Sequence, residues 1–309
     1  MKGVLTVAWF TSWRWILAAV VLLTSGMAFI LMIHAPDTLN SRIDLEAVGI
    51  PGIRAKGTFD QGIRSVTLKR AYDESKPIWE GREEGAGSLV YRTVNIAPSV
   101  WLWFTVRNGS VVDVAPYVDT DGRRGSYLRV LVAQQLSFPD WAGTFQAKTI
   151  PGADSGSIAS QISFRYKSPD FFIVKDLYEL PKLSRFIVWC PAEQITIFKT
   201  RKDWYATRPV DDLLGLMSDE NSEKEQARGE KKSHDVKAAE APPVTFNGLV
   251  EKVVPLSNRL TGQRFQLVQV RLAGLLIDVL VAGRLIEQPI IPNNVALCTG
   301  VLYGTFCSR

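Results

Sequence analysis

The sequence has few histidines and cysteines, the residues used most often in acid–base, nucleophilic and zinc chemistry. The only histidines are His34 and His234, and the only cysteines are Cys190, Cys298 and Cys307. One histidine follows a long apolar run and the other lies in a charged segment, so neither falls where a domain is expected to fold. A Ser-His-Asp triad, a Cys-His pair and a histidine-ligated zinc site are therefore excluded from the expected domains. We expect no metal and no cofactor.

Carboxylates are the one class of side chain left that would support hydrolysis. Glycoside hydrolysis needs only two acids at a suitable separation. The acidic candidates are Asp113, Asp119, Asp121 and Asp140. Their spacing singles out no pair, and the Asp119–Asp121 stretch favours a turn over a calcium loop because the other EF-hand ligands are missing. We assign no catalytic residue, so whether the protein is an enzyme stays open, and a binding role is favoured.

A run of apolar residues near the N-terminus predicts a membrane segment. Residues 15–33 carry no charged side chain and would span roughly 28 Å as a helix, close to the thickness of a bilayer core. Tryptophans before the run suit an interfacial belt, and two basic residues place the N-terminus in the cytoplasm by the positive-inside rule. These residues are Trp9, Trp13, Trp15, Lys2 and Arg14. We expect a cytoplasmic segment at 1–14 and a transmembrane helix at 15–34 of the inner (plasma) membrane.

Two other interpretations of the apolar run stay open. A cleaved signal peptide is disfavoured because Pro36 follows the apolar run where a cleavage site would lie. A reversed topology would place the bulk of the chain in the cytoplasm instead of outside it.

Composition divides the rest of the chain into three parts. Residues 35–217 alternate between apolar and polar positions, which predicts a β-rich extracytoplasmic domain with a few short helices. Nearly half of residues 218–243 are charged and none is aromatic, which predicts a disordered charged linker, with a solvated helix as the alternative. Residues 244–309 predict a second, smaller β domain that folds on its own.

Strand predictions in the first domain depend on alternation and on one turn. The predicted strands cover 65–70, 89–94, 100–106, 111–114, 127–132, 158–166 and 194–199, and short helices are expected at 171–180 and 210–217. Asn108-Gly109 lies between two of these strands and is the strongest hairpin signal in the chain. The run with Trp101, Trp103 and Phe104 is interpreted as core instead of a binding platform, because tryptophans two residues apart share one strand face.

Residues 244–306 combine alternating strands with glycines and a proline at the expected bends and turns. These residues are Gly248, Gly262, Pro292 and Gly300. With these features, residues 244–306 resemble the OB-fold, a small β-barrel with a long bent first strand and a short helix before its closing strands. Another small barrel or a four-stranded sheet is the alternative. The expected fold class is thus one N-terminal transmembrane helix, a mainly-β exported domain and a small OB-like barrel.

The resemblance implies a binding face, because OB-folds bind oligonucleotides, oligosaccharides or proteins on one side of the barrel. The candidate binding residues on that face are Arg259, Arg264, Arg271 and Tyr303. Isolated arginines on a solvated strand face are the alternative interpretation. The net charge of +5 is spread along the chain without the density of a nucleic-acid surface, so nucleic acid is the least favoured ligand. Cys298 and Cys307 would form a disulfide or remain buried thiols.

These observations favour a single-pass membrane-anchored envelope protein that binds partners without catalysis, as an accessory or assembly subunit. The expected partners are the membrane itself, proteins of the envelope and glycan. The alternative is an envelope enzyme that acts on glycan with paired carboxylates.

Overall fold

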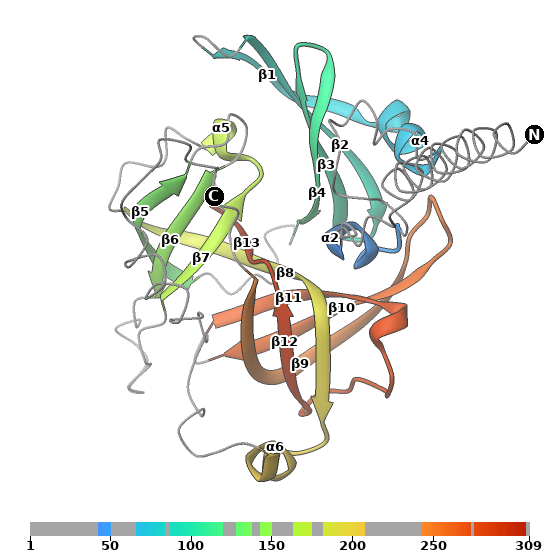
Figure 1. Cartoon of the computed structure of the whole chain (residues 1–309), viewed down its shortest axis with the longest axis vertical. Helices are drawn as coiled ribbons and strands as arrows, with labels where there is room; N and C mark the ends of the chain where they lie inside the picture. The colour runs from blue at the N-terminus through green and yellow to red at the C-terminus, as the bar shows by residue number, and fades with distance from the viewer. Residues whose placement is uncertain are drawn as a thin grey trace, which may run out of the picture. The chain divides into compact units, whose positions relative to one another are not determined.

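The computed structural model describes residues 43–50, 66–83, 87–119, 128–137, 143–149, 163–174, 182–207, 243–272 and 275–306. Residues 41–309 form one compact unit. Its strands make a four-stranded sheet and a nine-stranded sheet (Figure 1). The prediction of a mainly-β chain is therefore confirmed.

The predicted fold class, with an N-terminal transmembrane helix, is corrected by the structure. In the part of the chain that the structure describes, no helix is both long and apolar enough to cross a bilayer. The longest helix there, α4, has 9 residues, whereas a membrane span needs about 20. The backbone polar groups of this part pair mainly between strands instead. Residues 15–34, where the span was predicted, lie outside the described residues, so the predicted location of the chain stays a prediction.

The four-stranded sheet is an antiparallel meander. Its strands are β1 (Lys76–Glu83), β2 (Gly87–Ala97), β3 (Val100–Arg107) and β4 (Ser110–Val118). The central strand β3 is buried along almost its whole length, as its apolar sequence predicts. Asn108 and Gly109 have φ of 49° and 81°, the left-handed values that a two-residue hairpin turn requires, so the predicted hairpin is confirmed.

The segment predicted as a strand at 65–70 is a helix. In α4 (Val66–Glu74), Leu68 and Ala71 are buried three residues apart, which is helical spacing. Val66, which a strand would place on the same face as Leu68, is 84% exposed. Alternation over so few residues fits both periods, and burial of one helix face decides between them. A shorter helix, α2 (Ile43–Glu46), precedes it in the described chain.

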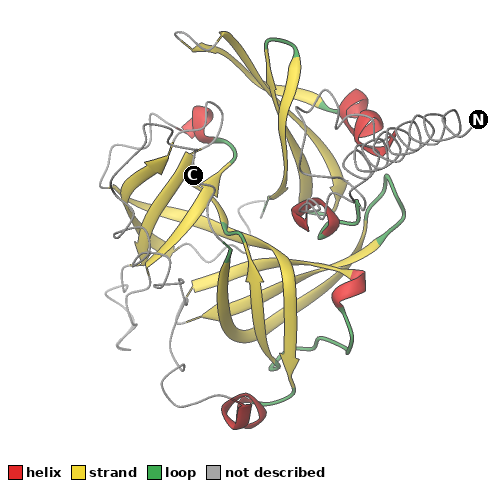
Figure 2. Ribbon diagram, in the orientation of Figure 1, coloured by secondary structure: helices red, strands yellow, loops and turns green. Residues whose placement is uncertain are grey.

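The nine-stranded sheet closes on itself twice, because β8 lies in the middle of the strand order and also pairs with the two end strands, β5 and β11. Figure 2 shows the strands of both sheets in yellow. The strands are β5 (Leu128–Ser137), β6 (Gly143–Thr149), β7 (Ser163–Ser168), β8 (Lys182–Phe198), β9 (Val244–Ser257), β10 (Arg264–Leu272), β11 (Leu275–Ala282), β12 (Val295–Gly300) and β13 (Tyr303–Phe306). The first ring runs β5–β6–β7–β13–β8 and returns to β5. The second ring runs β9–β10–β11–β8–β12 and returns to β9. The second ring confirms a small barrel-like arrangement in the C-terminal region.

Short helices lie between the strands of each ring. They are α5 (Phe171–Val174), α6 (Arg201–Thr207) and the 3-10 helix η3 (Gly283–Leu285). The first lies at the start of the helix predicted at 171–180, and the third occurs where the OB-fold resemblance implies a short helix before the closing strands. The helix predicted at 210–217 and the linker predicted at 218–243 lie outside the described residues.

Two hydrophobic cores hold the sheets together. One core joins the first ring, through Phe164 and Phe186, to the second ring, through Phe246 and Val270. The other packs the four-stranded sheet and α2 against one side of the second ring, where Phe265 is buried. Cys190 and Cys298 are buried free thiols, so Cys298 forms no disulfide and the alternative of a small hydrophobic side chain is confirmed for both.

Strand pairing crosses the predicted boundary between 35–217 and 244–309. The strand β8 belongs to the first of these segments, yet it supplies a parallel neighbour to β11 and an antiparallel neighbour to β12. The division into five parts itself stays a prediction. The closure of the second ring nevertheless depends on residues that precede position 244.

The contact between β8 and β12 gives a first testable prediction. A Cβ at Gly300 would meet the carbonyl oxygen of Pro191 and would lie 2.8 Å from Sγ of Cys190. We expect Gly300→Ala to lower the free energy of unfolding by about 2–3 kcal/mol, because backbone and a buried thiol must move apart. Urea denaturation followed by tryptophan fluorescence measures the change.

The matched control is Gly109→Ala in the exposed hairpin turn, where a Cβ would meet no atom within 4 Å but φ is +81°. This control should cost only about 1 kcal/mol, from the left-handed backbone alone. Equal losses in the two variants would contradict the tight approach of β12 to β8.

Candidate functional site

The structure does not bring the four predicted binding residues together. Arg259 lies in the connection between β9 and β10, Arg264 begins β10, and Arg271 lies near the end of that strand. Tyr303 begins β13 and is buried. Seven residues along a strand separate the second and third arginines by roughly 23 Å, so they do not share one small patch.

Two of these residues make contacts inside the chain. The Arg259 side chain donates from Nε to the carbonyl oxygen of Asn95 at 2.6 Å and from Nη1 to Oε2 of Glu74 at 2.8 Å. The Tyr303 ring stacks on Trp189 with centroids 5.8 Å apart, and its hydroxyl donates to Oδ2 of Asp44 at 3.3 Å. Through these contacts, both residues attach the two strand rings to the four-stranded sheet and to the helices α2 and α4, which come earlier in the chain.

The other two arginines are exposed. Arg271 forms an ion pair with Glu251 on the neighbouring strand β9, with Nη2 donating to Oε2 at 2.9 Å. The hydrogen bonds from Arg271 hold the pKa of Glu251 below its ordinary value. Arg264 is exposed at the start of β10, and within the described part of the chain its side chain has no hydrogen bond. Only Arg264 fits the alternative of an isolated arginine on a solvated strand.

These contacts separate the arginines experimentally. We expect Arg259→Ala to lower the urea midpoint of unfolding, because it leaves the Asn95 carbonyl and the Glu74 carboxylate without this donor. Arg264→Ala, the matched control, should leave the midpoint within error. Thermal and urea unfolding of the three proteins checks this, and an unchanged midpoint for Arg259→Ala would show that the contact contributes nothing to stability.

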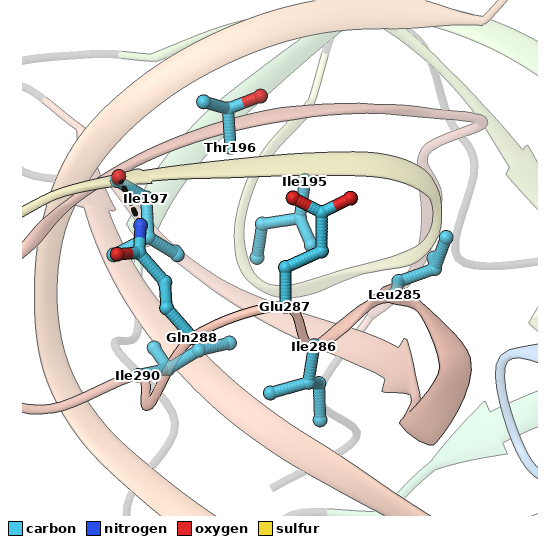
Figure 3. A pocket seen from close by; sticks show the side chains of 8 residues that line it. All are labelled: Ile195, Thr196, Ile197, Leu285, Ile286, Glu287, Gln288 and Ile290. Atoms are coloured by element: carbon cyan, nitrogen blue, oxygen red, sulfur yellow. Dashed lines mark hydrogen bonds between the residues drawn. The ribbon is translucent and has the colours of Figure 1, made fainter.

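A small aliphatic pocket on the second ring is a better candidate site. It has a volume of about 130 Å³ and lies between the last part of β8 and the connection from η3 to β12 (Figure 3). Its lining residues are Ile195, Thr196, Ile197, Leu285, Ile286, Glu287, Gln288 and Ile290. Five of these eight side chains are aliphatic, and the other three carry a hydroxyl, a carboxylate and an amide.

The pocket lies where the second ring is split. The strand β8 pairs with β11 only over residues 188–191, whereas its pairing with β12 continues to Phe198. Pro191 ends the parallel ladder because it has no N–H to donate. Beyond this residue, the described part of the chain places no strand on that edge of β8. The amide of Gln288 reaches across and donates from Nε2 to the carbonyl oxygen of Ile197 at 2.6 Å (Figure 3).

An exposed apolar side chain lies beside the pocket, on a loop that hydrogen bonds hold in place. Ile291, which follows the lining residue Ile290, is 55% exposed. Asn294 fixes the loop by donating to the carbonyl oxygen of Lys199 at 3.3 Å and by accepting from the N–H of Ile291. The loop is therefore held in place while an isoleucine side chain faces water, an arrangement that favours contact with an apolar group.

The sequence missed this site because no single stretch contains it. Ile195 and Ile197 alternate in a strand, and Leu285 and Ile286 follow a different strand about ninety residues later. Each half has the pattern of an ordinary buried segment. The one indication of this site in the sequence is the pair of isoleucines next to the Pro-Asn-Asn turn at 290–294, where a turn would ordinarily carry polar residues.

The acids considered for catalysis are dispersed. Asp113 lies in β4 and Asp119 follows it, while Asp121 and Asp140 lie outside the described residues. Two other acids, Asp44 and Glu193, do interact. Burial raises the pKa of Glu193 above its ordinary value, and the charge of Asp44 raises it further. In the described part of the chain, no group of three or more histidine, cysteine or acidic side chains is placed to hold a metal ion.

The aromatic run forms core, as predicted. Trp103 and Phe104 are buried, and Trp101 is partly buried. Ring contacts continue across the four strands of the first sheet and reach β8, with centroids 5.0–5.4 Å apart. These contacts join Trp79, Tyr91, Trp103, Tyr117 and Trp189. Rings packed at this distance in a core leave no open platform for a sugar.

Comparison with protein families, with curated proteins and with solved structures finds no match to this chain. The geometry therefore carries the functional argument by itself.

Asp278, buried in β11, gives the second ring a pH-dependent stability. Burial raises its pKa to about 6 from an ordinary value of 3.8, although Gln269 donates to its Oδ1 at 3.0 Å. Between these pH values the folded chain binds a proton that the unfolded chain has lost. The free energy of unfolding therefore falls as pH rises from about 4 to about 6.

We expect Asp278 to contribute a decline of about 3 kcal/mol over that range, at 1.36 kcal/mol per unit of pKa difference. Urea denaturation between pH 4 and 7.5 measures the decline. Asp278→Asn should remove this part of the slope, while the exposed matched control Asp73→Asn should keep the wild-type profile. A slope unchanged by Asp278→Asn would refute the assignment.

Proposed function

We propose that the protein is a non-catalytic binding module in the assembly of a protein complex, and that its contact site is the aliphatic pocket of the second ring. The supporting observation is the split beside β8, where a pocket lined mainly by aliphatic residues and a strand edge without a described neighbouring strand occur together. The strand order of this ring, a three-strand meander with a closing strand parallel to the third, is compatible with the OB-like fold that the sequence resemblance implied, and this supports a binding role.

The volume of the pocket favours a single side chain of a protein as its occupant. Cavities that hold cofactors and drug-sized ligands measure about 300–1,000 Å³. This one, at about 130 Å³, compares with a cavity of about 150 Å³ that accepts one benzene ring. It therefore has room for one leucine, isoleucine or phenylalanine side chain.

Two neighbouring features describe the rest of the partner segment. The Glu287 carboxylate lies in the lining and favours a lysine or arginine beside the inserted apolar side chain. The edge of β8 after Pro191 can accept an extended backbone, the mode by which peptides add a strand to an exposed sheet edge, once the Gln288 side chain releases the carbonyl oxygen of Ile197. The partner is thus an extended protein segment with an aliphatic or aromatic residue next to a basic one.

A peptide library tests this proposal. Random heptapeptides displayed on phage are selected on the full chain, and the enriched peptides are synthesised and titrated by fluorescence anisotropy. We expect enrichment of an apolar residue next to Lys or Arg. Affinity should fall at least about tenfold in Ile286→Glu, because a buried carboxylate would then occupy the pocket.

Val66→Glu is the matched control, because Val66 is 84% exposed on α4, away from the pocket lining. Binding to this variant should equal wild type. Glu287→Gln should weaken only the preference for the basic residue. Enriched peptides without an apolar residue, or equal binding to Ile286→Glu, would refute the pocket as the contact site.

Hydrolysis of a glycan by paired carboxylates is the second candidate function. The specific observation is the interaction of Asp44 with Glu193, since a general acid with a raised pKa beside an ionised carboxylate is what glycosidases use. The hydroxyl of Tyr303 donates to Oδ2 of Asp44 at 3.3 Å and orients this carboxyl group. Release of reducing ends from a polymeric glycan, abolished in Glu193→Gln, would favour this function over the binding module.

A further inference from the structure

The two rings share one strand order. In the second ring, the meander β9–β10–β11 is followed by η3 and then by β12, which pairs with β9. In the first ring, the meander β5–β6–β7 is followed by α5 and then by the first part of β8, which pairs with β5. The remaining strand of each ring is parallel to the third strand of its meander and antiparallel to the fourth strand. The chain between β5 and β13 therefore consists of two structural repeats.

The last strand of each ring comes from the other repeat. If each ring were built only from consecutive strands of the chain, the end of β8 would close the first ring and β13 would close the second. Residues 188–198 of β8 instead complete the second ring, and β13 completes the first. Figure 1 shows β8 continuing from the strands β5–β7 to the strands β9–β12. The two repeats have exchanged their closing strands within one chain.

We propose that the slot between β7 and β8 is a binding site for an extended strand, which the chain fills with its own β13 and which also accepts β13 of a second copy. This site is separate from the aliphatic pocket of the second ring. Donation of a strand to a neighbouring copy is a recognised route to dimers, because every contact of the donated strand already exists in the monomer.

The slot recognises β13 by shape at Gly304. A Cβ at this position would meet ring carbons of Phe186 and would lie 3.1 Å from Cδ2 of Tyr166. The aromatic side chains of Phe186 and Tyr166 are buried, with ring centroids 4.6 Å apart, so neither side chain can turn away freely. Only a glycine therefore fits between them.

The slot also recognises β13 by hydrogen bonds on either side of this glycine. The hydroxyl of Thr305 donates to Oδ2 of Asp170, whose other oxygen accepts from Ser168 at 3.0 Å. Asp170 is buried, so its carboxylate depends on these donors for the hydrogen bonds that water would otherwise supply. Tyr303 stacks on Trp189 and bonds to Asp44. The slot is thus specific for a strand that carries an aromatic residue, a glycine and a hydroxyl residue in succession.

The strand β13 has short ladders with its neighbours and a short connection to β12. It pairs with β8 from Tyr303↔Trp189 to Phe306↔Phe186, and with β7 only at Tyr303↔Lys167. Residues 301–302 alone connect it to β12. Such a short connection gives the strand an effective concentration on the order of millimolar in its own chain. A strand from a second copy should therefore enter only when the internal strand is weakened.

A labelled peptide replaces the second copy in the test. It comprises residues 299–309 with Cys307→Ser and a fluorescein, and it is titrated into full chains by anisotropy. We expect the Gly304→Val chain, whose own strand no longer fits, to bind this peptide at least about tenfold more tightly than the wild-type chain does. A peptide carrying Gly304→Val itself should not bind to either chain.

Thr305→Val is the milder variant, because it keeps the shape of the strand and removes only the bond to Asp170. It should also bind the peptide more tightly than wild type, by less than Gly304→Val. Near-UV circular dichroism verifies that each variant keeps its packed aromatic core. Equal affinity of wild type and both folded variants, or equal binding of the two peptides, would overturn the proposal. Loss of the folded spectrum in both variants would overturn it too, because a slot that collapses without β13 cannot receive another strand.

Discussion

The continuity of β8 is the constraint on which the two rings depend. One strand supplies both a fourth strand to the first ring and a closing strand to the second, so neither ring can move without displacing the other. The change of role occurs over residues 186–192, where the pairing of β8 with β5 and β13 ends and its pairing with β11 and β12 begins. Pro191 lies in this stretch. Gly300 lies against the same residue and allows β12 to approach β8 closely. A residue without an N–H and a residue without a Cβ thus lie where β8 passes from the first ring to the second.

This arrangement explains why the predicted binding face contributes contacts inside the chain. In an isolated OB-fold, the outer face of the second and third strands is available to ligand. Here Phe265 and Leu280, on β10 and β11, belong to the core that includes the four-stranded sheet. Arg259 hydrogen-bonds the backbone of β2. The contact surface that we propose is instead the opening beside β8, where the parallel ladder with β11 stops at Pro191.

Local features of the fold were predictable from the sequence, and long-range pairing was not. The buried strand at 100–106 and the Asn108-Gly109 turn follow from composition and turn chemistry. The strand predicted at 65–70 was wrong because six alternating residues satisfy a helix as well. The exchange of closing strands leaves no mark in periodicity, since the β13 sequence would alternate in the same way in either ring. The pocket was equally invisible, because its halves are separated by about ninety residues.

The position of β13 has a consequence for the order in which the chain acquires its structure. Chains emerge from the ribosome from the N-terminus, and early segments usually fold as soon as their contacts are available. The strands β5, β6 and β7 are synthesised long before residues 303–306, yet their ring cannot close until that strand arrives. During this interval Phe186 and Tyr166 lack the backbone that covers them. Contacts this distant in sequence also make folding slow, so the nascent chain passes through a period in which its first ring is open to chaperones and to other nascent chains.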